Sequence, residues 1–144
     1  NKLGKIKYLI KDELELKYRS SNLTDELIVL KADFIYKYSS ESEILEKKNY
    51  IKFKRESSQP IKEKTSGSTF KNPSGEYAAA LIEKAGCKGM RIGGASVSTV
   101  HSNFIINNGE ATALDIENLG KKIIKQVQEK FGITLEWEIK IIGT

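Results

Sequence analysis

The segment Ser66–Pro73 holds the densest set of side chains that could do chemistry. Its eight residues combine small hydroxyl residues with Gly67, Lys71 and Asn72. Backbone N–H groups beside a glycine, together with a cation and an amide, can hold a phosphate or a carboxylate. A turn that caps the following helix would have the same composition, so both interpretations stay open. The pattern GxxxxGK[ST] does not occur, and phosphoryl transfer therefore has no support.

A second candidate is the glycine-rich basic stretch Arg91–Ser98, which precedes His101, Asn103 and Asn107. Paired glycines allow a backbone to approach a ligand or another strand closely. A lone histidine is more often structural than catalytic, and no second His or Cys lies at metal-ligand spacing, so the sequence predicts no metal site. The single cysteine, Cys87, is expected to be a small buried hydrophobe rather than an activated thiol.

A pair of carboxylates near the C-terminal end is the third candidate. Alternation of apolar and polar residues places Glu136 and Glu138 on one face of an expected strand, about 7 Å apart. Solvated surface glutamates are the ordinary alternative. An acid on this strand could lie beside the segment Ser66–Pro73, here called the Ser68 loop, in the folded protein. Sequence spacing does not decide whether it does.

The elements that must position these residues alternate between strand and helix patterns. Period-two alternation and short apolar runs predict strands, and apolar spacing of three or four with capping residues predicts helices. The expected strands are 5–10, 27–38, 104–106 and 135–141, the expected helices 40–57, 77–85 and 112–131, and the expected loops 61–75 and 86–98. The pattern indicates an α+β fold with a small, mainly antiparallel sheet covered by helices, and a change of unit near Tyr38.

The composition is that of a globular protein. Of the 144 residues, 39% are hydrophobic and 30% charged, and no apolar run is long enough to cross a membrane. The single cysteine agrees with a reducing compartment. A formal net charge of +5 favours an anionic partner without choosing among nucleic acid, membrane surface and phosphorylated metabolite. The first residue, Asn1, suggests that a longer chain precedes this sequence.

Several sequence blocks occur in order along nearly the whole chain: 18–21 (Tyr-Arg-Ser-Ser), 66–73 (SGSTFKNP), 77–86 (YAAALIEKAG), 88–98 (KGMRIGGASVS), 101–107 (HSNFIIN), 111–115 (ATALD) and 131–143 (FGITLEWEIKIIG). Together these blocks resemble the UDP-N-acetylenolpyruvoylglucosamine reductase family. Only Pro73–Tyr77 separates two of these motifs, so the chain resembles the subclass that lacks an extra loop at this point.

The resemblance implies two domain assignments. Residues 1–37 would be the C-terminal tail of an FAD-binding α+β domain, and residues 38–144 the substrate-binding C-terminal domain. The glycine-rich FAD-binding blocks of the family would lie upstream of Asn1. The chain by itself is therefore expected to be inactive.

The resemblance also implies a flavoprotein oxidoreductase. NADPH would reduce FAD, hydride would pass from flavin N5 to the enolpyruvyl C3 of UDP-N-acetylglucosamine enolpyruvate, and protonation of C2 would give UDP-N-acetylmuramate. Matching of motifs makes Ser68 the proton donor to C2 and Glu138 the group that stabilises or relays charge at the enol intermediate. Further residues match positions where the family contacts the nucleotide-sugar: Tyr18, Lys71, Asn72 and His101.

Such an enzyme would act in the cytoplasm, in peptidoglycan precursor synthesis, and so in cell wall biogenesis, cell shape and cell division. A monomer without nucleic-acid or membrane partners is expected. The alternative from a different class is a non-catalytic basic module that binds nucleotides or nucleic acid, suggested by the sequence pI of about 9.2 and the loop glycines. The chain has no RRM, KH or zinc-finger signature, and its aromatic residues are not interleaved with basic ones.

Overall fold

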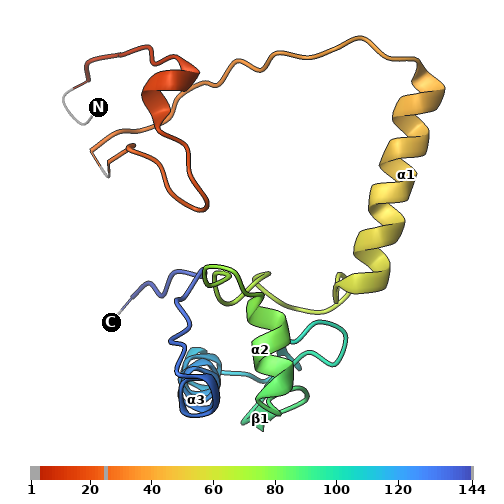
Figure 1. The fold of residues 1–144 in the computed structure, drawn as a ribbon, viewed down its shortest axis with the longest axis vertical. Coiled ribbons are helices and arrows are strands. Elements are labelled where there is room, and N and C mark those ends of the chain that lie inside the picture. The colour runs from red at the N-terminus through yellow and green to blue at the C-terminus, as the bar shows by residue number, and fades with distance from the viewer. Residues whose placement is uncertain (1–3, 25, 144) are drawn as a thin grey trace. The chain divides into compact units, whose positions relative to one another are not determined.

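The computed structural model describes residues 4–24 and 26–143, and the chain divides into two compact units after Ser40. The first unit holds a short 3-10 helix, η1 (Lys11–Leu14), none of whose residues is buried. A tight turn follows at Tyr18 and Arg19, closed by backbone hydrogen bonds of 2.9 and 3.2 Å between Lys17 and Ser20. Figure 1 traces this unit in red and orange.

The strands expected at residues 5–10 and 27–38 do not form in the described part of the first unit, so these two predictions are wrong. The apolar side chains that suggested them are exposed: Leu30, Phe34 and Tyr36 are 75%, 85% and 72% accessible. A strand needs a hydrogen-bonded neighbour for its N–H and C=O groups. Alternation marks a segment that can pair, but no described segment pairs with it here.

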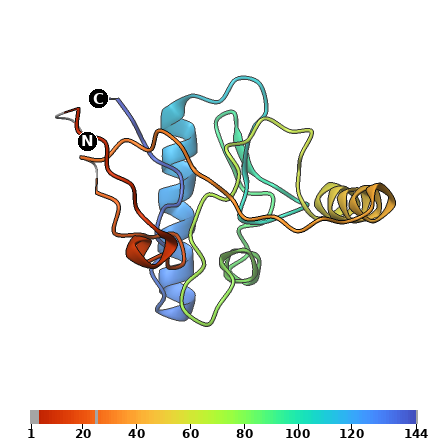
Figure 2. The same ribbon diagram turned by 90° about the horizontal axis from the view of Figure 1, so that it is seen from above.

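The second unit holds a three-stranded sheet and three helices (Figures 1 and 2). The sheet is antiparallel with the strand order β1-β2-β3. Helix α3 packs against all three strands, and α2 packs against α3. This arrangement confirms the α+β fold with a small antiparallel sheet covered by helices. The elements are α1 (Glu41–Ser58), α2 (Ala78–Lys84), β1 (Arg91–Ile92), β2 (Ala95–Val97), β3 (Ile105–Asn107) and α3 (Ala113–Phe131).

The sequence predicts a loop over residues 86–98, and the structure corrects this prediction for residues 91–97, which form a β-hairpin. Strands β1 and β2 pair antiparallel with Ile92 opposite Ala95, so Gly93 and Gly94 form a two-residue turn, which favours glycine. A Cβ at Gly94 would overlap the backbone of Ala111, 2.7 Å from its Cα. The paired glycines therefore serve the close approach of a second backbone.

Local capping signals place the ends of α2 and α3 as predicted. The Thr112 hydroxyl accepts the Asp115 N–H at 3.1 Å, and the Asp115 carboxylate accepts the Thr112 N–H at 2.9 Å. Gly132 ends α3 in the left-handed region at φ 70°. Gly86 follows α2 at φ 81°, and the Cys87 N–H bonds the Ile82 carbonyl at 3.1 Å, which closes the helix.

The core forms where the apolar stripe of α3 meets the sheet and α2. Leu119, Ile123 and Val127 are fully buried, at the spacing of three to four residues that the sequence predicted. Helix α1 also forms where expected, but none of its residues is buried. No helix among the described residues has both the length and the apolar character needed to span a membrane.

The strand expected at residues 135–141 shortens to a single antiparallel bridge between Trp137 and Phe70. The prediction of a full strand is wrong because the neighbouring segment pairs only around Phe70. Leu135 is buried and the Trp137 ring lies over Gly120 of α3, whereas Ile141 is 59% exposed, so the predicted apolar face is buried only at its start.

Candidate active site

The Ser68 loop runs between two other chain segments and is bonded to both. On one side the Thr69 N–H donates to the Asn103 carbonyl at 2.8 Å, and Ser68 forms an isolated bridge with Phe104. On the other side the Glu138 N–H donates to the Thr69 carbonyl at 2.9 Å. Ser68 and Glu138, which are 70 positions apart in sequence, therefore lie on adjoining segments.

Burial fixes the C-terminal side of Ser68, and a glycine lies on its N-terminal side. Thr69 and Phe70 are each 1% exposed, and the Phe70 ring packs on Trp137 with 5.0 Å between ring centroids. Gly67 has φ 91°, a conformation that residues with a side chain rarely adopt. Ser68 itself is half-buried. The backbone that carries its hydroxyl is therefore held on the C-terminal side, at Thr69 and Phe70.

Asn103 is a structural anchor of the loop that the sequence interpretation quoted but did not assign. Its side-chain carbonyl accepts the Phe70 N–H at 2.9 Å, and its side-chain NH2 donates to the Phe70 carbonyl at 2.8 Å. The Asn103 amide therefore makes the two hydrogen bonds with Phe70 that a neighbouring strand would otherwise make. The only local signal was a polar residue directly before the apolar run Phe104–Ile106.

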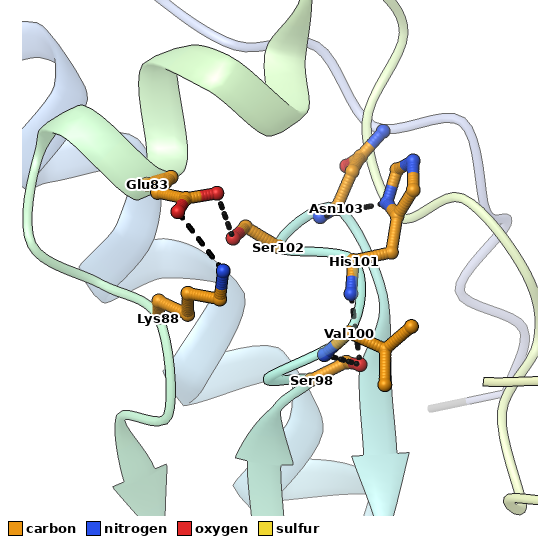
Figure 3. A network of polar contacts seen from close by, with 7 residues as sticks. All are labelled: Glu83, Lys88, Ser98, Val100, His101, Ser102 and Asn103. Carbon is orange, nitrogen blue, oxygen red and sulfur yellow. Dashed lines mark hydrogen bonds and ion pairs between the residues drawn. The ribbon is translucent and has the colours of Figure 1, made fainter. Parts of the chain in front are cut away.

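The turn that carries Asn103 is held from within and from α2, as Figure 3 shows. The Ser98 hydroxyl accepts the N–H groups of Val100 and His101 at 3.1 and 3.2 Å. The Ser102 hydroxyl donates to Glu83 at 3.5 Å, which is a weak contact, and Glu83 forms a 2.9 Å ion pair with Lys88.

The ion pair also sets the charge state of Glu83. A hydrogen bond from Lys88 and its positive charge hold the pKa of Glu83 below its ordinary value, and the Ser102 hydrogen bond acts in the same direction. The carboxylate is therefore ionised at neutral pH, where it can accept from both partners. Because both side chains are well exposed, the pair contributes little stability by itself.

His101 lies beside this loop as a half-buried, neutral ring. Its ring packs edge-on against Phe104, with 4.7 Å between centroids, and its Nδ1 accepts the Asn103 N–H at 3.3 Å. Burial lowers the pKa of His101, against the opposite effect of a backbone hydrogen bond. With Nδ1 accepting, the neutral ring carries its proton on Nε2, where it can donate to a ligand.

Lys71 and Asn72 continue the Ser68 loop, and both have contacts within the protein. The Lys71 ammonium pairs with Glu136 at 3.2 Å on the surface. The Asn72 side-chain carbonyl accepts the Ala78 N–H at 3.0 Å, at the start of α2. The turn that caps the following helix, one of the two interpretations of this loop, is therefore present; it leaves the anion-binding interpretation open.

Tyr18 is the one predicted site residue that belongs to the first unit. It is 59% exposed, and the Arg19 guanidinium lies 5.5 Å from the centroid of its ring. The other five predicted residues, Ser68, Lys71, Asn72, His101 and Glu138, all lie in the second unit, on the Ser68 loop and its two neighbouring segments.

Two other features of the second unit lie apart from this site. A groove of about 360 Å³ runs between residues 59–63 and the turn 98–100, and none of the predicted site residues lines it. Cys87 is fully buried and donates to Gln126 at 2.8 Å; burial raises the pKa of its thiol, although Lys122 and Lys130 oppose this. No group of three His, Cys, Asp or Glu that could hold a metal ion occurs in the described part of the chain.

The sequence matches one protein-family model over residues 59–142, that of the UDP-N-acetylenolpyruvoylglucosamine reductase C-terminal domain. A protein of that name from Rickettsia conorii is 54% identical over 132 residues, which is 92% of this chain and 45% of the relative. The Rickettsia typhi protein of the same name is 51% identical over 98% of this chain and 48% of its own length. The chain thus spans about half the length of the curated relatives it matches.

A solved structure agrees with the sequence matches. The crystal structure of UDP-N-acetylenolpyruvylglucosamine reductase from Thermus caldophilus superposes with a TM-score of 0.74 and 39% sequence identity. The match covers 88% of this chain and 46% of that one.

Proposed function

The chain belongs to the UDP-N-acetylenolpyruvoylglucosamine reductase family, and we propose that it is the substrate-handling half of an oxidoreductase that makes UDP-N-acetylmuramate. Residues 38–144 would bind the substrate, UDP-N-acetylglucosamine enolpyruvate. Residues 1–37 would be the tail of the domain that binds FAD, and NADPH would be the reductant.

One observation carries the proposal beyond the family match. The Glu138 N–H bonds the Thr69 carbonyl at 2.9 Å, so the proposed proton donor and the proposed acid belong to adjoining segments. His101 lies on the segment at the opposite side of the same loop, next to the bond from Thr69 to Asn103. A substrate bound at this loop would meet groups from three parts of the chain.

The chemistry suits these residue types. After hydride addition at C3, the substrate carbanion at C2 is basic enough to take the proton of a serine hydroxyl: the Ser68 O–H bond breaks as a C–H bond forms. Glu138 would stabilise or relay charge in this step, and solvent would return the proton to Ser68. A positioned general acid of this kind contributes roughly 10²–10⁴ in rate.

The remaining residues would bind and orient the nucleotide-sugar. The substrate carries a pyrophosphate and a carboxylate, which agrees with the net charge of +5 and with a cation, Lys71, on the loop. Asn72, whose side-chain carbonyl caps α2, would contact the nucleotide-sugar, and neutral His101 would donate its Nε2–H. Tyr18 would also contact the nucleotide-sugar.

FAD would be bound mainly by the rest of the enzyme. The paired glycines of the β1–β2 turn do not form an open cradle for a cofactor, because Gly94 is closed off by the backbone of Ala111. A flavin bound by the rest of the enzyme would supply the hydride. The contribution of this chain is to hold the substrate and to protonate it.

This activity would place the protein in the cytoplasm and in peptidoglycan precursor synthesis, and through it in cell wall biogenesis, cell shape and division. The test is to purify the whole gene product, measure its flavin content, and incubate it with NADPH and UDP-N-acetylglucosamine enolpyruvate. We expect bound FAD and a product heavier by two hydrogen atoms in mass spectrometry. A flavin-free protein, or one that leaves the substrate unchanged, would overturn the proposal.

A further inference from the structure

We propose that Asn103 is a positioning residue for catalysis: its carboxamide holds the Phe70 peptide and thereby sets the place of the Ser68 hydroxyl. This inference rests on the proposed function, because it assigns Asn103 a part in the proton transfer from Ser68. It concerns a residue that would touch neither the substrate nor the flavin.

The contacts of Asn103 are those of a clamp. Its amide makes both hydrogen bonds with one peptide, to the Phe70 N–H at 2.9 Å and the Phe70 carbonyl at 2.8 Å. Its own backbone carbonyl accepts the neighbouring Thr69 N–H at 2.8 Å. One residue therefore holds three backbone groups in the two positions that follow Ser68.

Burial makes this clamp hard to replace. Asn103 is 4% exposed, and Thr69 and Phe70 are 1% exposed, so water cannot readily take over the lost hydrogen bonds. Without the amide, the Phe70 N–H and carbonyl would have to turn toward other partners, and that rotation would move the adjoining backbone. Ser68 would move with it, because Gly67 on its other side offers little resistance.

The clamp is itself held in place. The Ser98 hydroxyl bonds the backbone of the turn 98–103. The Ser102 hydroxyl makes a weak contact with Glu83 of α2, and the Asn103 and His101 side chains extend away from that contact (Figure 3). The anchor therefore connects the packed helix α2 to the Ser68 loop. A proton donor needs such support, since a misplacement of about 1 Å can cost roughly 10²-fold in rate.

The first measurement uses the whole gene product and asks whether Asn103 holds the loop. Asn103→Leu removes both hydrogen bonds at similar volume, and Asn108→Leu, at an exposed position, is the control for loss of an amide that bonds a backbone carbonyl. The Asn108 amide also bonds a backbone carbonyl, that of Gly94 at 2.9 Å, at the β1–β2 turn. We expect amide hydrogen exchange at Thr69 and Phe70 to accelerate at least about tenfold only in Asn103→Leu, with α3 unchanged. Equal exchange in both variants would overturn the inference.

The second measurement uses the whole gene product with FAD and asks whether the clamp acts through Ser68. We expect Asn103→Leu to lower kcat by about 10–100-fold, with the Kd of the UDP-sugar, measured by calorimetry, within about twofold of wild type. Asn103→Asp keeps an acceptor for the Phe70 N–H, so its kcat should lie between those of Asn103→Leu and wild type. If Asn103→Leu does not fold, Asn103→Asp is measured in its place. In a Ser68→Ala background, Asn103→Leu should cause almost no further loss.

The outcomes separate the two proposals. Wild-type kcat in Asn103→Leu and Asn103→Asp, or a loss that multiplies fully with that of Ser68→Ala, would overturn the positioning role and leave the proposed function intact. A Ser68→Ala variant with normal turnover would remove the proposed proton donor, and the role of Asn103 would be overturned with it.

Discussion

Replacing Gly120 with alanine should destabilise the second unit, although glycine-to-alanine changes within helices usually stabilise. Gly120 is buried in α3 beneath Trp137. A Cβ at this position would lie 2.7 Å from Cζ3 and 2.9 Å from Cζ2 of the Trp137 ring, and closer still to Cη2. Three atoms of a rigid ring cannot give way as the end of a flexible side chain can.

The two opposing effects can be compared in magnitude. Alanine is better than glycine in a helix interior by about 1 kcal/mol. Overpacking of a core costs about 1–3 kcal/mol, and overlap with three ring atoms places Gly120→Ala in the upper half of that range. The free energy of unfolding should therefore fall by about 1–2 kcal/mol, as the difference between these two effects.

Urea unfolding followed by far-UV circular dichroism measures this change, with the emission of Trp137, the single tryptophan, as a second probe. Asn118→Ala, at an exposed position of α3, is the propensity control and should stabilise by several tenths of a kcal/mol. In a Trp137→Phe background, where the outer ring is missing, Gly120→Ala should cost at least about 1 kcal/mol less. If Gly120→Ala instead stabilised the wild-type chain by about 1 kcal/mol, the packing argument would be refuted.

Three further predictions concern capping, charge and burial. Thr112→Ala should lower the free energy of unfolding by about 1 kcal/mol through loss of the N-cap of α3, whereas Thr112→Ser should retain most of it; equal losses in urea unfolding would contradict the capping role. Lys88→Met should raise the pKa of Glu83 toward its ordinary 4.5, seen by carbon NMR titration of the carboxyl group. The pKa of Glu83 is lower in the folded than in the unfolded chain, so the ion pair with Lys88 stabilises the fold above pH 4.5, and this stabilisation is lost as the pH falls through the lowered pKa. An unchanged pKa of Glu83 in Lys88→Met would argue against the ion pair. Cys87 should react with a thiol reagent only after unfolding, since burial encloses the thiol and raises its pKa; equal labelling rates in native and urea-unfolded protein would contradict its burial.

Helices and their ends could be predicted from the sequence because their signals are local. Thr112 and Gly132 bracket an apolar stripe, and each interacts with residues within one turn. The strands were predicted less well, because a strand is made by a partner that may lie anywhere in the chain. Residues 27–38 and 135–141 both show the alternation of a strand, but pairing was decided by which segments came to lie beside them.

The candidate site, like the fold, could be predicted from the sequence only in part. The resemblance singled out Ser68 and Glu138 by motif, and the fold brings their segments together through the bond from Glu138 to Thr69. The Asn103 clamp could not be predicted, because the Asn103 side chain makes two hydrogen bonds to the Phe70 backbone, 33 positions away in the sequence. The one local signal is its place directly before the apolar run Phe104–Ile106, and an asparagine in an ordinary turn can have the same place.

The most direct test of the central claim is the rate at which UDP-N-acetylglucosamine enolpyruvate oxidises the NADPH-reduced flavin of the whole gene product, measured by stopped flow without oxygen. With Ser68→Ala, we predict that NADPH still bleaches the flavin at the wild-type rate, whereas reoxidation by substrate slows by roughly 10²–10⁴-fold. Asn108→Leu should match wild type in both steps. Reoxidation of Ser68→Ala at the wild-type rate would contradict the assignment of the proton donor and the account of this site.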